Sequence, residues 1–141
     1  MSAACLDLIV REVDLQPGEH VLDVGCGAGA LSLAAADLVG DAGSVTGVDM
    51  SAPLLTVARQ RPGAGVVALL QADAQTHDFG DSRVDAIVSR FGVMFFDDPA
   101  AAFLNLAGAL RPGGRIVFAC WRDLIENEWI MVPAVAALEH V

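Results

Sequence analysis

The apolar positions of this chain follow two alternating patterns. Short, almost continuous apolar runs are typical of strands buried on both faces of a sheet. The segments between them carry apolar residues at every third or fourth position, the spacing of a helix that buries one face. The runs that predict strands are His20–Val24, Ser44–Val48, Val66–Leu70, Val84–Val88 and Arg115–Trp121.

Helices are expected before the first of these runs and in most of the intervals after it. Ser51 is expected to cap one helix, with Leu54 on its inner face, and Asp98 with Pro99 is a typical start of another. The segments His77–Arg83 and Leu110–Gly114 are predicted as loop or turn, the second because Pro and two glycines follow one another. The predicted helices cover residues 2–14, 29–39, the segments after Ser51 and Asp98, and 132–140.

This order of elements predicts one α/β domain over residues 1–141. Strands that alternate with helices form parallel sheets with right-handed crossovers. The expected architecture is a Rossmann-like, doubly wound sheet with strand order 3-2-1-4-5 and helices on both faces. In such a sheet the ligand crevice lies beyond the carboxyl ends of strands 1 and 4. Those ends carry the Gly25–Gly29 turn and the Ser89–Phe96 segment.

Composition narrows the classes of partner. Hydrophobic residues make up 55% of the chain and charged residues 18%, and the net charge is −10. Such an acidic chain disfavours nucleic acid and anionic membranes as partners. The three cysteines show neither a disulfide framework nor a metal spacing, which favours the cytoplasm. No apolar run reaches the roughly 18 residues of a membrane span.

The turn Gly25–Gly29 is the first candidate for a binding site. Three alternate glycines follow a buried strand and open a helix, with the small Cys26 between the first two. Such a turn lets a ligand lie directly on the backbone beside the N–H groups of the helix. All residues of the turn, Gly29 included, are therefore candidate ligand contacts.

Two acids indicate which ligand this is. Asp49 ends the second strand, twenty residues after Gly29, where nucleotide and adenosyl ligands both use a carboxylate to bind ribose. The glycine spacing differs from the dinucleotide fingerprint, and Asp23 would repel a pyrophosphate by about 1 kcal/mol or more. A ligand with an ammonium and a sulfonium, such as S-adenosylmethionine, fits better. The alternatives are that Asp49 only caps the next helix and that Asp73 is an ordinary loop carboxylate.

The chain resembles the class I S-adenosylmethionine-dependent methyltransferases, near the small-molecule group that methylates ubiquinone and menaquinone precursors. The resemblance rests on five segments that occur in the family's order. They are Val21–Gly29, Val45–Ser51, Gln71–Ala74, Val84–Phe91 and Leu110–Gly114.

For the adenosine half of the cofactor, the resemblance implies four contacts. Asp49 would accept the ribose hydroxyls, and Met50 would pack on the adenine. Asp73 would accept from the adenine amino group, while the Ala74 N–H would donate to a ring nitrogen.

For the methionine half, the resemblance implies that Gly25 and Gly27 hold this moiety on the backbone, with Asp23 near its ammonium. Ser89 and Arg90 would flank the methyl-transfer end. The acceptor is expected to be a small molecule. The aromatic residues that follow Arg90 either line the acceptor site or pack the corner between strand and helix: Phe91, Met94, Phe95 and Phe96. No residue is identified as a general base, and no metal is expected.

Related enzymes usually have more chain before the first strand and two further strands after the fifth. We therefore expect a truncated core whose fifth strand is an exposed edge, which invites pairing with a second copy. Two other functions stay open. The chain could be an S-adenosylmethionine-binding module that needs a partner for catalysis, or, less well supported, an NAD-dependent oxidoreductase.

Overall fold

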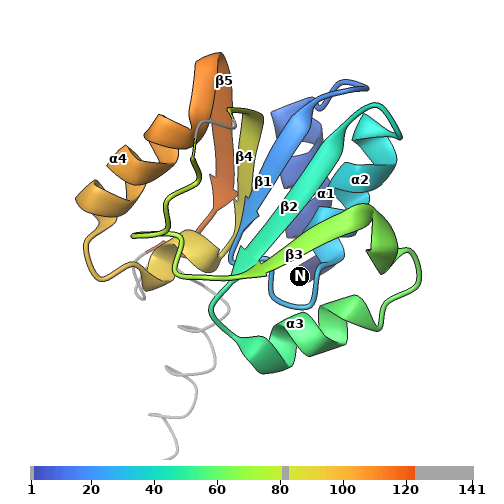
Figure 1. Cartoon of the computed structure of the whole chain (residues 1–141), viewed down its shortest axis with the longest axis horizontal. Helices are drawn as coiled ribbons and strands as arrows, with labels where there is room; N and C mark the ends of the chain where they lie inside the picture. Colours follow the sequence, from blue (N-terminus) through green and yellow to red (C-terminus); the bar gives the residue numbers. More distant parts are fainter. Residues whose placement is uncertain (1, 81–82, 123–141) are drawn as a thin grey trace, which may run out of the picture.

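Five parallel strands form one sheet in the order β3-β2-β1-β4-β5 (Figure 1), which confirms the predicted topology. The computed structural model describes residues 2–80 and 83–122. Its strands are β1 (His20–Val24), β2 (Ser44–Asp49), β3 (Val67–Gln71), β4 (Val84–Arg90) and β5 (Leu110–Ala119).

Helices cover both faces of the sheet, also as predicted: α1 and α2 lie on one side and α4 on the other (Figure 1). The predicted caps are present, because Ser51 Oγ accepts from the Leu54 N–H at 3.4 Å and Asp98 Oδ1 from the Ala101 N–H at 3.0 Å. The predicted helix over 132–140 lies outside the described residues. The helices are α1 (Ser2–Val13), α2 (Ala30–Val39), α3 (Ala52–Arg59) and α4 (Pro99–Ala109), with short 3-10 turns η1 (Ala64–Val66) and η2 (Gly92–Phe95).

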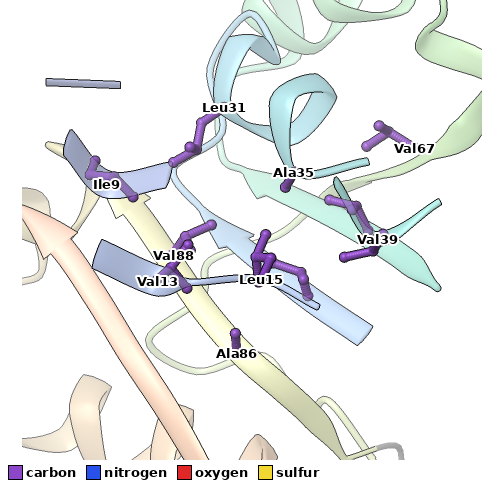
Figure 2. Packing of buried hydrophobic residues seen from close by; sticks show 11 residues of the cluster. Ile9, Val13, Leu15, Leu31, Ala35, Val39, Val67, Ala86 and Val88 are labelled. Carbon is purple, nitrogen blue, oxygen red and sulfur yellow. The ribbon is translucent and has the colours of Figure 1, made fainter. Parts of the chain in front are cut away.

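Alternation along the strands divides the core into two layers. Val21 points to the side of α1 and α2, where Ile9, Val13 and Ala35 pack on the sheet (Figure 2). Leu22, the next residue of β1, belongs to the opposite layer under α4. The strands are therefore apolar throughout because both of their faces are buried.

The start of β5 differs from the prediction. Leu110 pairs with Val84 and Arg115 with Ala86, so residues 111–114 stand opposite Asp85 alone. Pro112 has no N–H for the ladder, which explains why the segment loops out as a bulge within the strand. The strand also ends at Ala119, two residues before the predicted end.

Two further findings concern membrane-spanning helices and metal ligands. Within residues 2–80 and 83–122, no helix has the length and apolar character needed to cross a membrane. The same part of the chain holds no cluster of three or more His, Cys, Asp or Glu side chains suited to a metal ion.

Candidate functional site

A cavity of about 390 Å³ opens where β1, β2 and β4 end, at the predicted crevice of the sheet. Seven of the eleven predicted site residues line it: Gly25, Gly27, Asp49, Met50, Asp73, Ala74 and Arg90. The other lining residues are Val24, Val48, Ser51, Leu54, Ala72, Phe91, Gly92, Phe95 and Phe96.

The floor of the cavity is the backbone of the glycine turn. Gly25 and Gly27 have φ values of 67° and 54°, a left-handed conformation that residues with a Cβ atom rarely adopt. The N–H groups of Gly25 and Cys26 both donate to the Val48 carbonyl, at 2.8 and 3.0 Å. The turn is thus fixed to the end of β2 and exposes bare backbone to the cavity.

Asp49 joins the glycine turn to the start of α3. Its Oδ2 accepts from the Gly27 N–H and its Oδ1 from the Ser51 N–H, each at 2.8 Å. Ser51, rather than Asp49, is therefore the cap of α3, and Asp49 lines the cavity. A carboxylate has about four acceptor positions, so each oxygen can accept a further hydrogen bond from a ligand.

Asp73 and Ala74 line the cavity from the segment that follows β3. Asp73 Oδ1 accepts from the Gln75 N–H at 2.9 Å, and Ala74 is buried. Met50 and Leu54 stand at the same opening with 68% and 44% of their surface exposed. The prediction that Leu54 points inward was wrong, because its side chain faces the cavity rather than the core.

Asp23 lies behind the turn and is not among the lining residues. It is buried on the α2 side of the sheet, where Ser32 Oγ donates to its Oδ2 at 2.5 Å. Its Oδ1 is buried and has no hydrogen-bond partner within the described part of the chain. Burial raises the pKa of Asp23 to about 6, although the Ser32 hydroxyl and the charge of Arg90 oppose this shift.

Three more predicted residues lie outside the cavity lining. Ser89 is fully buried, and its hydroxyl donates to the Val24 carbonyl at 2.7 Å and accepts from the Gly92 N–H at 3.1 Å. Cys26 is buried beneath the turn, and burial raises the pKa of its thiol to about 12, so the thiol stays protonated. Gly29 is buried where α2 begins.

The wall on the β4 side is aromatic and consists of Phe91, Phe95 and Phe96. Phe91 has φ 69°, strained for a residue with a side chain, and its ring stacks on Trp121 with centroids 4.6 Å apart. Phe95 is 82% exposed, whereas Phe96 also packs edge-on against Phe103. Corner packing therefore occurs at Phe96, whereas Met94 is not among the lining residues and the use of this segment as an acceptor site stays a prediction.

Sequence reasoning did not single out Gly92 or Leu54 for the site. Gly92 could have been noticed, because a glycine just after a predicted strand often marks a place where another backbone segment comes close. Leu54 gave no such signal, because its spacing fits the inner face of α3.

Comparison with known proteins matches residues 22–118 to the model of a family described as a methyltransferase domain. Among curated proteins, the chain is 36% identical over 104 residues to aklanonic acid methyltransferase DauC of Streptomyces sp. (strain C5), covering 72% of this chain and 47% of that protein. It is 32% identical over 111 residues to demethylmenaquinone methyltransferase of Shouchella clausii, with coverages of 77% and 47%.

Solved structures share the fold. YcgJ from Bacillus subtilis matches with a TM-score of 0.76 and 26% identity over 91% of this chain and 56% of that one. The [4+2]-cyclase SpnF matches with a TM-score of 0.70 and 27% identity, covering 80% of this chain and 42% of that one. This chain spans about half the length of the curated relatives it matches.

Proposed function

The chain belongs to the methyltransferase domain family, and from that premise we propose that its cavity binds S-adenosylmethionine for methyl transfer to a small-molecule acceptor. The observation that carries the proposal is the position of Asp49. Its carboxylate lines the cavity and is held by two backbone N–H groups, from Gly27 and Ser51. A carboxylate fixed in this way is suited to accept the two hydroxyls of a ribose.

The residues beside Asp49 suit an adenine ring. Met50 and Leu54 offer apolar surface at the opening, and Asp73 and Ala74 offer a carboxylate and a backbone N–H in the same wall. We assign Met50 to the face of the ring, Asp73 to the amino group and the Ala74 N–H to a ring nitrogen.

The residues behind and beside the glycine turn suit the methionine end. Among residues 2–80 and 83–122, the Oδ1 of Asp23 has no hydrogen-bond partner. A buried acceptor of this kind is costly unless a donor or a positive charge approaches it. An ammonium group near the turn would satisfy that need. Gly25 and Gly27 leave room for the ligand, and Arg90 lines the cavity at the end of β4.

When bound, S-adenosylmethionine supplies an electrophilic methyl group on a sulfonium. The contribution of the chain is to orient donor and acceptor and to exclude water. Phe91 and Phe95 supply an apolar wall for the acceptor. The relatives named above are methyltransferases of aklanonic acid and demethylmenaquinone, which supports a small-molecule acceptor here. We assign no general base, because one is required only if the acceptor must lose a proton.

Two alternatives from other classes are kept. The first is a cofactor-binding module without turnover of its own, completed by a partner or by a second copy paired along β5. The name of SpnF, a cyclase, illustrates that this fold is not limited to one reaction. The second is an NAD-dependent oxidoreductase, which the buried Asp23 carboxylate disfavours because it would oppose a pyrophosphate. We place the protein in the cytoplasm, acting as one domain.

A transfer assay separates the enzyme from the module. The protein is incubated with S-adenosylmethionine carrying a labelled methyl group and a panel of quinols, phenols and carboxylic acids. If an acceptor becomes labelled, and this labelling is lost in an Asp49 variant, the protein is an active methyltransferase. Binding of S-adenosylhomocysteine without transfer to any acceptor favours the module.

A further inference from the structure

Asn105 holds the segment after β3 from the middle of α4. Its side-chain Nδ2 donates to the Ala74 carbonyl at 3.0 Å and to the His77 carbonyl at 2.9 Å. Asn105 is half-buried and does not itself line the cavity. None of the five motif segments contains it, so its place in the structure is new information.

The carbonyl that Asn105 holds belongs to the same peptide unit as the Gln75 N–H. That N–H donates to Asp73 Oδ1 at 2.9 Å. Because a peptide unit is planar and rigid, fixing its carbonyl also fixes the direction of its N–H. A continuous chain of two hydrogen bonds thus runs from Asn105 through this peptide to the Asp73 carboxylate, and each bond polarises the next.

Further bonds anchor the same segment. The Asp98 N–H, at the start of α4, donates to Gln75 Oε1 at 2.9 Å. The Asp73 carbonyl accepts from the His77 N–H at 2.8 Å. The Gln75 contact ties the segment to α4 independently of Asn105, and the His77 contact closes a turn within the segment. Removal of the Asn105 amide is therefore expected to free the Ala74 and His77 carbonyls rather than the whole segment.

We propose that Asn105 is a positioning residue for base recognition: through the Ala74–Gln75 peptide it orients the Asp73 carboxylate so that the cavity accepts a 6-amino purine and rejects a 6-oxo purine. This inference rests on the proposed function. A carboxylate held in one direction accepts a hydrogen bond from an amino group at the purine 6-position and repels a carbonyl oxygen at the same position. Without the Asn105 donor, the peptide can rotate and the carboxylate loses its fixed direction.

Isothermal titration with two ligands tests the proposal. The ligands are S-adenosylhomocysteine and S-inosylhomocysteine, which differ at the purine 6-position. The variants are Asn105→Asp, which keeps the side-chain shape but replaces the donor by a charged carboxylate oxygen, and Leu104→Ala, a control at a neighbouring position of α4 that is 77% exposed. Circular dichroism establishes that each variant is folded, and Asn105→Ala replaces Asn105→Asp if the latter is not.

The wild type is expected to prefer the adenosyl ligand. Asn105→Asp should weaken adenosyl binding by about tenfold and inosyl binding by less than about twofold, while Leu104→Ala should leave both unchanged. Equal weakening of both ligands would show a merely structural role and overturn the proposal, as would unchanged selectivity. Failure of the wild type to bind S-adenosylhomocysteine would instead refute the proposed function.

Discussion

The backbones of Gly25 and Gly92 lie against each other where β1 and β4 end. A Cβ atom on Gly25 would stand 2.5 Å from Gly92 Cα, and one on Gly92 would stand 2.4 Å from the Val24 carbonyl oxygen. The Ser89 hydroxyl spans the same junction by its bonds to the Val24 carbonyl and the Gly92 N–H. This contact joins the glycine turn to the aromatic wall, so the two sides of the cavity keep a fixed separation.

Gly92→Ala is therefore expected to push the glycine turn and the aromatic wall apart. We expect a loss of about 2 kcal/mol in the free energy of unfolding, the usual cost of overpacking, and weaker binding of S-adenosylhomocysteine. Urea denaturation and isothermal titration measure the two effects.

Gly108→Ala is the matched control for that variant. Gly108 lies in α4, and a Cβ atom there would meet nothing within 4 Å in the described part of the chain. Alanine in a helix is favoured over glycine, so this variant should be more stable by about 0.5–1 kcal/mol. If Gly92→Ala and Gly108→Ala had the same free energy of unfolding and the same affinity for S-adenosylhomocysteine, the Gly25–Gly92 contact would not be important for either.

The buried Asp23 predicts an unusual dependence of stability on pH. Its pKa is raised from 3.8 to about 6 in the folded chain, so the folded state holds the proton more tightly than the unfolded state. The wild type should therefore lose about 2 kcal/mol relative to Asp23→Asn as the pH rises from 4 to 6. Urea denaturation of both proteins over this range measures the difference, and a constant difference would contradict the prediction.

Ligand affinity should follow the opposite trend, because only the ionised Asp23 carboxylate attracts an ammonium group. Binding of S-adenosylhomocysteine to the wild type is expected to weaken as the pH falls through about 6. Asp23→Asn should bind more weakly than the wild type at pH 7 and vary little with pH. If the affinity of both proteins for S-adenosylhomocysteine fell equally as the pH is lowered, Asp23 would not act on the ligand.

Arg115 ties α1 and β1 to the edge strand. Its guanidinium donates to both carboxylate oxygens of Glu19, at 2.8 and 2.6 Å, and to the carbonyls of Val13 and Asp14. Arg115→Met should cost about 3 kcal/mol, because it leaves the half-buried Glu19 carboxylate with the Gln16 N–H in place of a charged partner. Arg11→Ala, which breaks an exposed pair, should change stability by less than about 0.5 kcal/mol.

The same pair adds a test by pH. The hydrogen bond from Arg115 holds the pKa of Glu19 below its ordinary value of 4.5. A lowered pKa in the folded state stabilises the protein above pH 4.5, and this contribution is lost as the pH falls below it. The advantage of the wild type over Arg115→Met should therefore shrink in acid, as measured by denaturation at pH 7 and pH 3.5.

Local sequence signals were sufficient for the order of the strands and, to within two residues, for their carboxyl ends. The order of the strands follows from alternating elements. The acids Asp49 and Asp73 could be located because Asp49 directly follows an apolar run and Asp73 lies three residues after the next one. Alternation could also have placed Asp23, since Leu22 and Val24 share one face and Asp23 must therefore point to the other, under α2.

Contacts between distant segments could not be predicted in this way. Asn105 acts on Ala74, and Gly92 meets Gly25, only because the folded sheet brings these segments together. For the bulge of β5, the local signal was present but was interpreted too broadly. Pro112 and the two glycines after it do interrupt the pairing of the strand, but β5 begins before them and resumes pairing after them. Periodicity describes which face a residue takes, whereas such contacts depend on the tertiary arrangement.

Titration of the wild type and Asp49→Ala with S-adenosylhomocysteine and NAD tests the central claim most directly. We expect the wild type to bind S-adenosylhomocysteine and not NAD, and Asp49→Ala to bind it at least about tenfold more weakly. Circular dichroism of Asp49→Ala checks that the variant, which also loses the acceptor for Gly27 and Ser51, remains folded. Tight binding of NAD with no response to S-adenosylhomocysteine would contradict the account.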